Sequence, residues 1–225
     1  MVKTHNVLII DDHPLISNAY KDAFLEVSSK DSHIEFNIDI ANNCDIANEK
    51  IIAASLLKGL DIVFLDIRLP PSMDRKILSG EDLGIKIREI LPNTKIIIAT
   101  TFNDNYRIHS ICDSIDPDGF LIKNDITEKD IVKSIKEIIA DNPYFSTTVV
   151  KLMRKHMSNS FRIDSVDRQI LYQLSIGTKM KDLPDIIHLS IAAIEKRKRI
   201  LKEHFNIEGQ EDKVLIAIAK EKGFI

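Results

Sequence analysis

The sequence predicts an α/β domain with a doubly wound parallel sheet, followed by an all-α domain. Over the first 140 residues, five short runs rich in Ile and Val alternate with stretches of helical periodicity. Most of these runs are largely apolar, as strands buried on both faces of a parallel sheet are. The net charge is −8 over residues 1–150 (16 Lys and Arg, 24 Asp and Glu) and +5 over 151–225 (15 and 10), which indicates two modules with different partners.

Each unit of the first domain has its own local signals. The expected strands are 6–10, 35–40, 61–65, 95–100 and 119–122, and the expected helices are 14–27, 43–57, 81–91, 104–115 and 127–140. Asn43, Ser79 and Thr127 stand where helix N-caps are expected, and Asp130 follows Thr127 by three residues, as in a capping box. Five such units imply a (βα)5 parallel sheet with right-handed connections and helices on both faces.

No strand pattern follows residue 164, and the remaining chain is expected to be helical. The expected helices are 165–175, 179–187, 190–205 and 211–222, separated by Gly177, Ser190 and Gly209. The stretch between the two parts begins with turn-prone residues and continues as a basic, polar segment. The predicted organisation is therefore a first domain at 1–141, a linker at 142–162 and a second domain at 163–225.

Composition excludes several classes of protein. No apolar run approaches the roughly 20 residues that span a bilayer, so no membrane partner is expected. Cys44 and Cys112 are far apart and lack a CxxC partner, which favours a reducing, cytoplasmic location with unpaired thiols. The seven glycines form neither a GxGxxG nor a GxxxxGK[ST] pattern, so the usual nucleotide-binding loops are absent.

Polar side chains follow four of the five predicted strands. Asp11 and Asp12 come directly after the first strand, Asp66 after the third, Thr100 ends the fourth, and Lys123 follows the fifth. Chemistry in open parallel sheets lies at these carboxyl ends. Three crowded carboxylates require a cation, and their hard oxygen ligands suit Mg²⁺. A carboxylate surrounded by a cation, a hydroxyl and an ammonium is suited to accepting a phosphoryl group, with Asp66 as the nucleophile.

These residues resemble the receiver domain of bacterial two-component response regulators. The resemblance lies in VLIIDDHPLI (7–16), VFLDIRLP (63–70), IIIATTF (96–102) and GFLIK (119–123), and the DDHP run is similar to the NarL/LuxR-type subfamily. The resemblance implies that Asp66 is the phospho-acceptor and that Asp11, Asp12, Asp66 and the main-chain carbonyl of Arg68 bind Mg²⁺. It also implies that Thr100 bonds the phosphoryl group, that Lys123 pairs with it, and that Phe120 is the switch aromatic.

Three features depart from that pattern. Segment 70–80 is longer than the usual loop before the third helix and reads as an exposed insertion beside the site. Thr101 stands where a small residue is usual in the family, and its bulk near the phosphoryl pocket is expected to slow phosphorylation or hydrolysis. Asn124 follows Lys123 in place of proline, so no cis-proline is expected there.

The basic second domain is similar to the LuxR-type helix-turn-helix. Gly177 stands at the turn, Ser190 caps the predicted recognition helix 190–205, and an apolar face formed by Ile191, Ile194, Leu201 and Phe205 is expected to pack on the other helices. The opposite side carries the predicted DNA contacts. Lys196 and Arg199 are the base-edge candidates, with Ala192 beside them, and Arg197, Lys198 and Lys202 are the phosphate candidates.

Glu195 departs from this family, whose members often carry a basic, DNA-contacting residue at its position. A glutamate can accept a hydrogen bond from a cytosine amino group. An unusual base preference or a lower affinity for DNA is therefore expected.

The resulting hypothesis is a phosphorylation-controlled transcription factor. A sensor histidine kinase phosphorylates Asp66, and phosphorylation controls homodimerisation and binding to double-stranded DNA. The protein is not expected to be an enzyme beyond Mg²⁺-dependent self-phosphorylation and slow dephosphorylation. One alternative is a phosphorelay or protein-interaction receiver whose C-terminal helices bind protein rather than DNA. Another is an aspartate-nucleophile phosphatase, although the sequence lacks the Asp-x-Asp pair and the substrate cap of that class.

Overall fold

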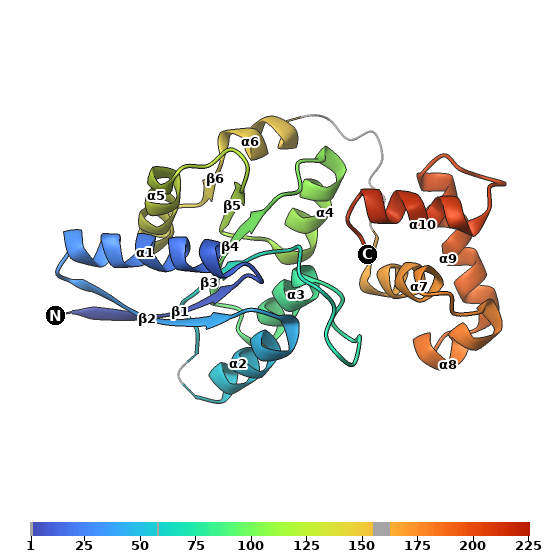
Figure 1. Cartoon of the computed structure of the whole chain (residues 1–225), viewed down its shortest axis with the longest axis horizontal. Helices are drawn as coiled ribbons and strands as arrows, with labels where there is room; N and C mark the ends of the chain where they lie inside the picture. Colours follow the sequence, from blue (N-terminus) through green and yellow to red (C-terminus); the bar gives the residue numbers. More distant parts are fainter. Residues whose placement is uncertain (1, 58, 155–162) are drawn as a thin grey trace. The chain divides into compact units, whose positions relative to one another are not determined.

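The computed structural model describes residues 2–57, 59–154 and 163–225 (Figure 1). The chain divides into two compact units, 1–156 and 157–225, and each is described by itself. The first is an α/β unit and the second is helical, which confirms the predicted fold class. None of the described helices combines the length and apolar character needed to cross a membrane.

One parallel sheet organises the described part of the first unit. Its strands are β1 (Lys3–Ile10), β2 (Ile34–Ala41), β3 (Ile62–Leu65), β4 (Lys95–Thr100), β5 (Gly119–Ile122) and β6 (Tyr144–Phe145). Their order is β2-β1-β3-β4-β5-β6, and every neighbouring pair is parallel. From β1 the chain continues to β2 on one side, and β3 and the later strands lie on the other side. The topological switch point of the sheet therefore lies between β1 and β3.

Helices cover both faces of the sheet. They are α1 (Pro14–Lys30), α2 (Cys44–Leu56), α3 (Gly80–Ile90), α4 (Asn105–Ile115) and α5 (Glu128–Ile139). Val7 and Ile9 of β1 belong to the core beneath α1 and α5, whereas Leu8 and Ile10 belong to the core beneath α2, α3 and α4. Alternate residues of a strand point to opposite faces, so one apolar strand supplies both cores.

The first unit continues beyond the boundary predicted at residue 141. Residues 144–153, expected to lie in the linker 142–162, instead form β6 and the helix α6 (Thr147–Met153). Val149 of α6 is fully buried in the same core as Phe120, and β6 extends the sheet beside β5. These residues join the first unit because Phe145 and Val149 bury apolar side chains against its core and β6 covers the otherwise open edge of β5. The rest of the predicted linker, 155–162, lies outside the described residues.

The second unit is a small helical domain. Its elements are α7 (Ser165–Ser175), a short 3-10 turn (Met180–Asp182), α8 (Leu183–Ile187), α9 (Ile191–His204) and α10 (Asp212–Glu221). The helix predicted at 179–187 is therefore shorter, and Pro184 lies in its first turn, where its missing amide is tolerated. Ile170, Leu183 and Ile194 bring α7, α8 and α9 together in one core.

Local signals of the second unit lie largely where the sequence placed them. Gly177 has φ of 86° after the end of α7, and the hydroxyl of Ser190 accepts a hydrogen bond from the amide of Ala193 at the start of α9. The predicted apolar face of α9 needs one correction. Ile194 and Leu201 are fully buried, but Ile191 is 44% exposed because the first turn of α9 is largely uncovered.

Candidate functional site

The carboxylates predicted from the sequence converge at the carboxyl ends of β1 and β3. Ile10 is registered opposite Leu65, so the residues that follow them, Asp11 and Asp66, lie side by side. The amide of Asp66 donates to the carbonyl of Ile10, which continues the ladder by one bond. Both carboxylates are buried, with 0% of Asp11 and 4% of Asp66 exposed.

Lys123 joins these two carboxylates. It follows β5, and its amide donates to the carbonyl of Thr100, which fixes the start of the loop after β5. Its Nζ lies 2.6 Å from Oδ2 of Asp11 and 2.6 Å from Oδ2 of Asp66. One ammonium therefore bridges two buried carboxylates that would otherwise repel each other.

The electrostatic environment of Asp66 is dominated by burial. Burial raises the pKa of the Asp66 carboxyl above its ordinary value, while Lys123 and the amide of Arg68, 2.9 Å from Oδ1, act in the opposite direction. Tyr20 of α1 lies in the same field. Its pKa is raised, first by burial and then by the charges of Asp11 and Asp66. The site is thus poor in positive charge for the number of carboxylates it holds.

The donor set fits a hard divalent cation. Asp11, Asp12, Asp66 and His13 each offer a ligand atom, and these atoms lie within 4.8 Å of one another. Oδ1 of Asp12 is buried and accepts no hydrogen bond, although Nδ1 of His13 lies 2.8 Å away. Three carboxylates against one lysine leave an uncompensated negative charge, and oxygen donors of this kind suit Mg²⁺. Arg68, predicted to supply its carbonyl, contacts Asp66 through its amide nitrogen.

The contacts of Thr100 and Phe120, the two predicted switch residues, lie outside this cluster. Thr100 is fully buried at the end of β4, and its hydroxyl accepts a hydrogen bond from the amide of Phe102 at 3.3 Å. Phe120 of β5 is fully buried in the core shared with α4 and α6. Within the described residues, no hydrogen bond joins Thr100 to the carboxylates. The structure therefore brings together Asp11, Asp12, Asp66 and Lys123, whereas no hydrogen bond or ion pair of the described residues joins Thr100 or Phe120 to them.

Sequence reasoning missed the contacts between the loop after β3 and helix α4. The guanidinium carbon of Arg68 lies 4.7 Å from the ring centroid of Phe102, and that of Arg107 lies 5.3 Å from the same centroid. Nη1 of Arg107 lies 2.6 Å from Oε2 of Glu81, and both side chains are fully buried. These contacts connect the residue two places after Asp66 to α3 and α4. No sequence signal pointed to these contacts, because periodicity alone does not show which charged helix positions a neighbouring helix buries.

The predicted insertion 70–80 forms an ordered turn. The amide of Met73 donates to the carboxylate of Asp45 at the start of α2, and Ser72 bonds both Asp74 and the amide of Ile77. The loop ends at Gly80, where a Cβ atom would lie 1.9 Å from the carbonyl oxygen of Asp66. Only glycine allows the first turn of α3 to approach the backbone of Asp66 this closely.

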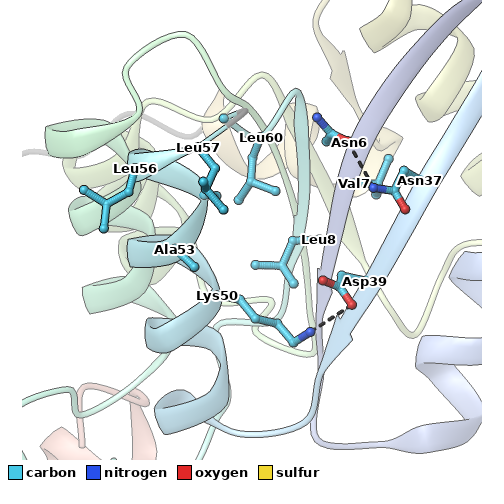
Figure 2. A pocket seen from close by; sticks show the side chains of 12 residues that line it. Asn6, Val7, Leu8, Asn37, Asp39, Lys50, Ala53, Leu56, Leu57 and Leu60 are labelled. Carbon is cyan, nitrogen blue, oxygen red and sulfur yellow. Dashed lines mark hydrogen bonds and ion pairs between the residues drawn. The ribbon is translucent and has the colours of Figure 1, made fainter.

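One pocket of the first unit is separate from the carboxylates. It lies between α2 and the central residues of β1 and β2, with a volume of about 550 Å³, and Figure 2 shows Leu56, Leu57 and Leu60 at its side. An ion pair between Lys50 and Asp39, 2.8 Å apart, lies at its edge. None of its lining residues is a predicted site residue, so it takes no part in the chemistry considered for Asp66.

The predicted DNA contacts of α9 fall into two groups. Arg197 pairs with Asp164 and Asp167 at 2.9 and 2.8 Å, and Lys198 and Lys202 lie 2.7 and 2.8 Å from the carboxylate of Asp212. We call Arg197, Lys198 and Lys202 the paired cations. They fix α9 to α7 and α10. Lys196 and Arg199 instead lie on the exposed face of the helix, and the lysines at 179 and 181, which sequence reasoning did not select, are also exposed before α8.

Comparison with known proteins adds independent information. No protein-family model matches the chain. The chain is 25% identical over 208 residues to the nitrate/nitrite response regulator protein homolog of Haemophilus influenzae, covering 91% of each sequence. It is 21% identical over 228 residues to the oxygen regulatory protein NreC of Staphylococcus epidermidis, covering 96% of this chain and 97% of that one.

Similar solved structures cover both units. RcsB from Salmonella enterica serovar Typhimurium, bound to promoter P1flhDC in the presence of the phosphomimetic BeF3−, has a TM-score of 0.59 at 18% identity over 96% of this chain and 97% of that one. A structure of two RcsB dimers bound to two parallel DNAs has a TM-score of 0.57 at 16% identity over 98% and 99% of the respective chains. These likenesses support the fold of both units, and the sequence relatives agree with the resemblance carried by the motifs.

Proposed function

We propose that this chain, a two-component response regulator with a receiver domain and a helix-turn-helix output domain, is phosphorylated on Asp66 and thereby controls its binding to DNA. The observation that carries this proposal is the bridge from Lys123 to Asp11 and Asp66, with Asp12 beside it. The proposed donor is a phosphohistidine of a sensor histidine kinase.

The chemistry follows from the positions of these side chains. An oxygen of the Asp66 carboxylate attacks phosphorus and forms an O–P bond while the P–N bond of the donor histidine breaks and its electron pair stays on nitrogen. Lys123 favours the ionised, nucleophilic form of Asp66 and then pairs with a phosphoryl oxygen. The hydroxyl of Thr100 donates to another. Asp11, Asp12, Asp66 and the main chain at Arg68 would hold Mg²⁺, which would supply positive charge to the phosphoryl group.

To transmit phosphorylation to the rest of the protein, part of the first unit must be able to adopt two alternative packing arrangements. When Thr100 turns its hydroxyl toward the phosphoryl group, it gives up its contact with the amide of Phe102. The change reaches Phe120 and the core it shares with α4 and α6. Because β6 and α6 cover β5, repacking of this face involves residues 144–153 as well as α4.

The proposed output is a homodimer that places two copies of α9 on double-stranded DNA. Lys196 and Arg199 are the exposed cations of that helix, and dimers of the related fold of RcsB are bound to DNA. Two-fold pairing matches a roughly palindromic site. Self-phosphorylation from small donors and slow dephosphorylation are the only catalysis we assign to the protein.

The test is intact-mass analysis after incubation with acetyl phosphate and Mg²⁺. The wild type should gain one phosphoryl group, stable in acid and lost in alkali. Asp66→Asn should gain none, whereas Asp22→Asn, which changes an exposed carboxylate of α1, should label like the wild type. Labelling of Asp66→Asn, or no labelling of the wild type when an established receiver labels fully, contradicts the proposal.

A further inference from the structure

The exposed face of α9 carries few charged side chains that could contact DNA. Residues three and four apart lie on one helix face, and Ala192, Glu195, Lys196 and Arg199 form such an exposed set. Ile194 and Leu201, on the other side, are fully buried. The three paired cations lie between these two faces and are already bound to Asp164, Asp167 and Asp212.

Glu195 is the acidic member of this exposed set. Within the described residues it has no ion pair or hydrogen bond, and Arg199 one turn later lies 3.5 Å from Glu203. Its side chain is exposed in the amino-terminal half of α9, beside the small side chain of Ala192. In helix-turn-helix proteins this half of the recognition helix contacts base edges. A carboxylate facing phosphates there would only repel them, so a role in binding requires a donor on a base.

We propose that Glu195 is a specificity-determining residue that accepts a hydrogen bond from the exocyclic amino group of a cytosine in the major groove. The inference rests on the proposed DNA-binding function. Guanine and thymine present acceptors at the corresponding edge, which repel a carboxylate. Adenine presents an amino group but also the acceptor N7 beside it. Cytosine offers the donor without that acceptor, so it is the base that Glu195 prefers.

Arg199 complements this choice. It lies one helical turn after Glu195 on the same exposed face, and its side chain is 70% exposed. Guanidinium groups bind O6 and N7 of guanine, the two acceptors on the partner of cytosine. A carboxylate and a guanidinium one turn apart therefore match a C·G pair, or a C·G pair and its neighbour, better than any A·T step.

The experiment is selection of double-stranded DNA from a random library by the full chain after incubation with acetyl phosphate and Mg²⁺. The variants are Glu195→Gln and Glu195→Ala, and the charge-matched control is Glu208→Gln, an exposed residue beyond the end of α9. The wild type and the control should select C at the same position of each half-site. Glu195→Gln should select A there, because glutamine bonds N6 and N7 of adenine, with the other positions unchanged.

Binding measurements then give the size of the effect. Replacing the selected C should weaken binding by the wild type about tenfold, and by Glu195→Ala less than about twofold. An unchanged selected sequence with uniformly tighter binding by both Glu195 variants overturns the proposal, because Glu195 would then only repel phosphates. If the wild type retains no DNA although Asp66 is labelled, the DNA-binding function itself fails, and this proposal with it.

Discussion

The ion pair between Glu81 of α3 and Arg107 of α4 is a buried charge interaction whose energy can be tested directly. Neither side chain is exposed, and 2.6 Å separates Nη1 of Arg107 from Oε2 of Glu81. The hydroxyl of Ser114 donates to the other carboxylate oxygen at 2.8 Å. We expect Arg107→Met to lower the free energy of unfolding of the first unit by about 3–5 kcal/mol, because the buried Glu81 carboxylate loses this ion pair.

A second contribution comes from Phe102. The guanidinium of Arg107 lies over this ring, and a desolvated cation–π contact is worth about 1–2 kcal/mol. The double variant Glu81→Leu/Arg107→Met removes both charges and fills similar volume, so it should lie within about 1 kcal/mol of the wild type after allowing for that contact. The double variant should therefore be more stable than Arg107→Met alone, which distinguishes this buried pair from an exposed one.

The assay is urea-dependent hydrogen exchange measured by mass spectrometry, because peptides from α3 and α4 report the first unit alone. Lys30→Met removes the exposed ion pair with Glu26 in α1 and serves as the control, with an expected cost below about 0.5 kcal/mol. The reasoning is refuted if Arg107→Met costs no more than the control, or if the double variant is as unstable as the single one.

Three other substitutions follow from the same contacts. Gly80→Ala should shift α3 away from the carbonyl of Asp66, lowering thermal stability by about 3 kcal/mol and slowing phosphorylation by acetyl phosphate, since the added Cβ would overlap backbone atoms. Asp116→Gly should raise the stability of the first unit by about 0.5–1 kcal/mol in urea titration, because Asp116 has φ of 51°. Burial would raise the pKa of Asp212, but hydrogen bonds from Lys198 and Lys202 outweigh it and hold the pKa below 3.8. The ionised Asp212 carboxylate therefore stabilises the folded state above pH 3.8, and this stabilisation is lost as the pH falls through the lower pKa of the folded protein. Asp212→Asn should cost the second unit about 0.5–1 kcal/mol at neutral pH, and acid titrations of the two proteins should converge well below pH 3.8.

The sheet and the carboxylate cluster were predictable because their signals are local. An apolar run ended by a carboxylate locates both a buried strand and a group at its carboxyl end, and parallel topology then brings Asp11, Asp66 and Lys123 together. The sixth strand gave no such signal. Tyr144–Phe145 is two residues long, and its pairing depends on the open edge of β5, which composition does not reveal.

Side-chain partners from distant parts of the chain were beyond the sequence patterns. Glu81 and Arg107 both read as ordinary charged helix residues, because periodicity cannot show that α3 and α4 bury those positions against each other. The same reason applies to Ile191, whose apolar character predicted burial although the first turn of α9 is uncovered. Helix faces follow from sequence, but which neighbour covers each turn follows only from the tertiary arrangement.

The partners of the cations on α9 bear on how strongly this domain depends on salt when it binds DNA. A run of basic residues predicts a large electrostatic contribution, but the three paired cations are already neutralised by Asp164, Asp167 and Asp212. Each phosphate neutralised contributes about −0.9 to the slope of log affinity against log salt concentration. The slope of the wild type should therefore be smaller in magnitude by about 2.7 than if Lys196, Arg199 and the three paired cations all contacted phosphates. Asp212→Asn frees Lys198 and Lys202, so a salt titration of DNA binding should show a steeper slope for this variant, and an unchanged slope would contradict this account of the pairing.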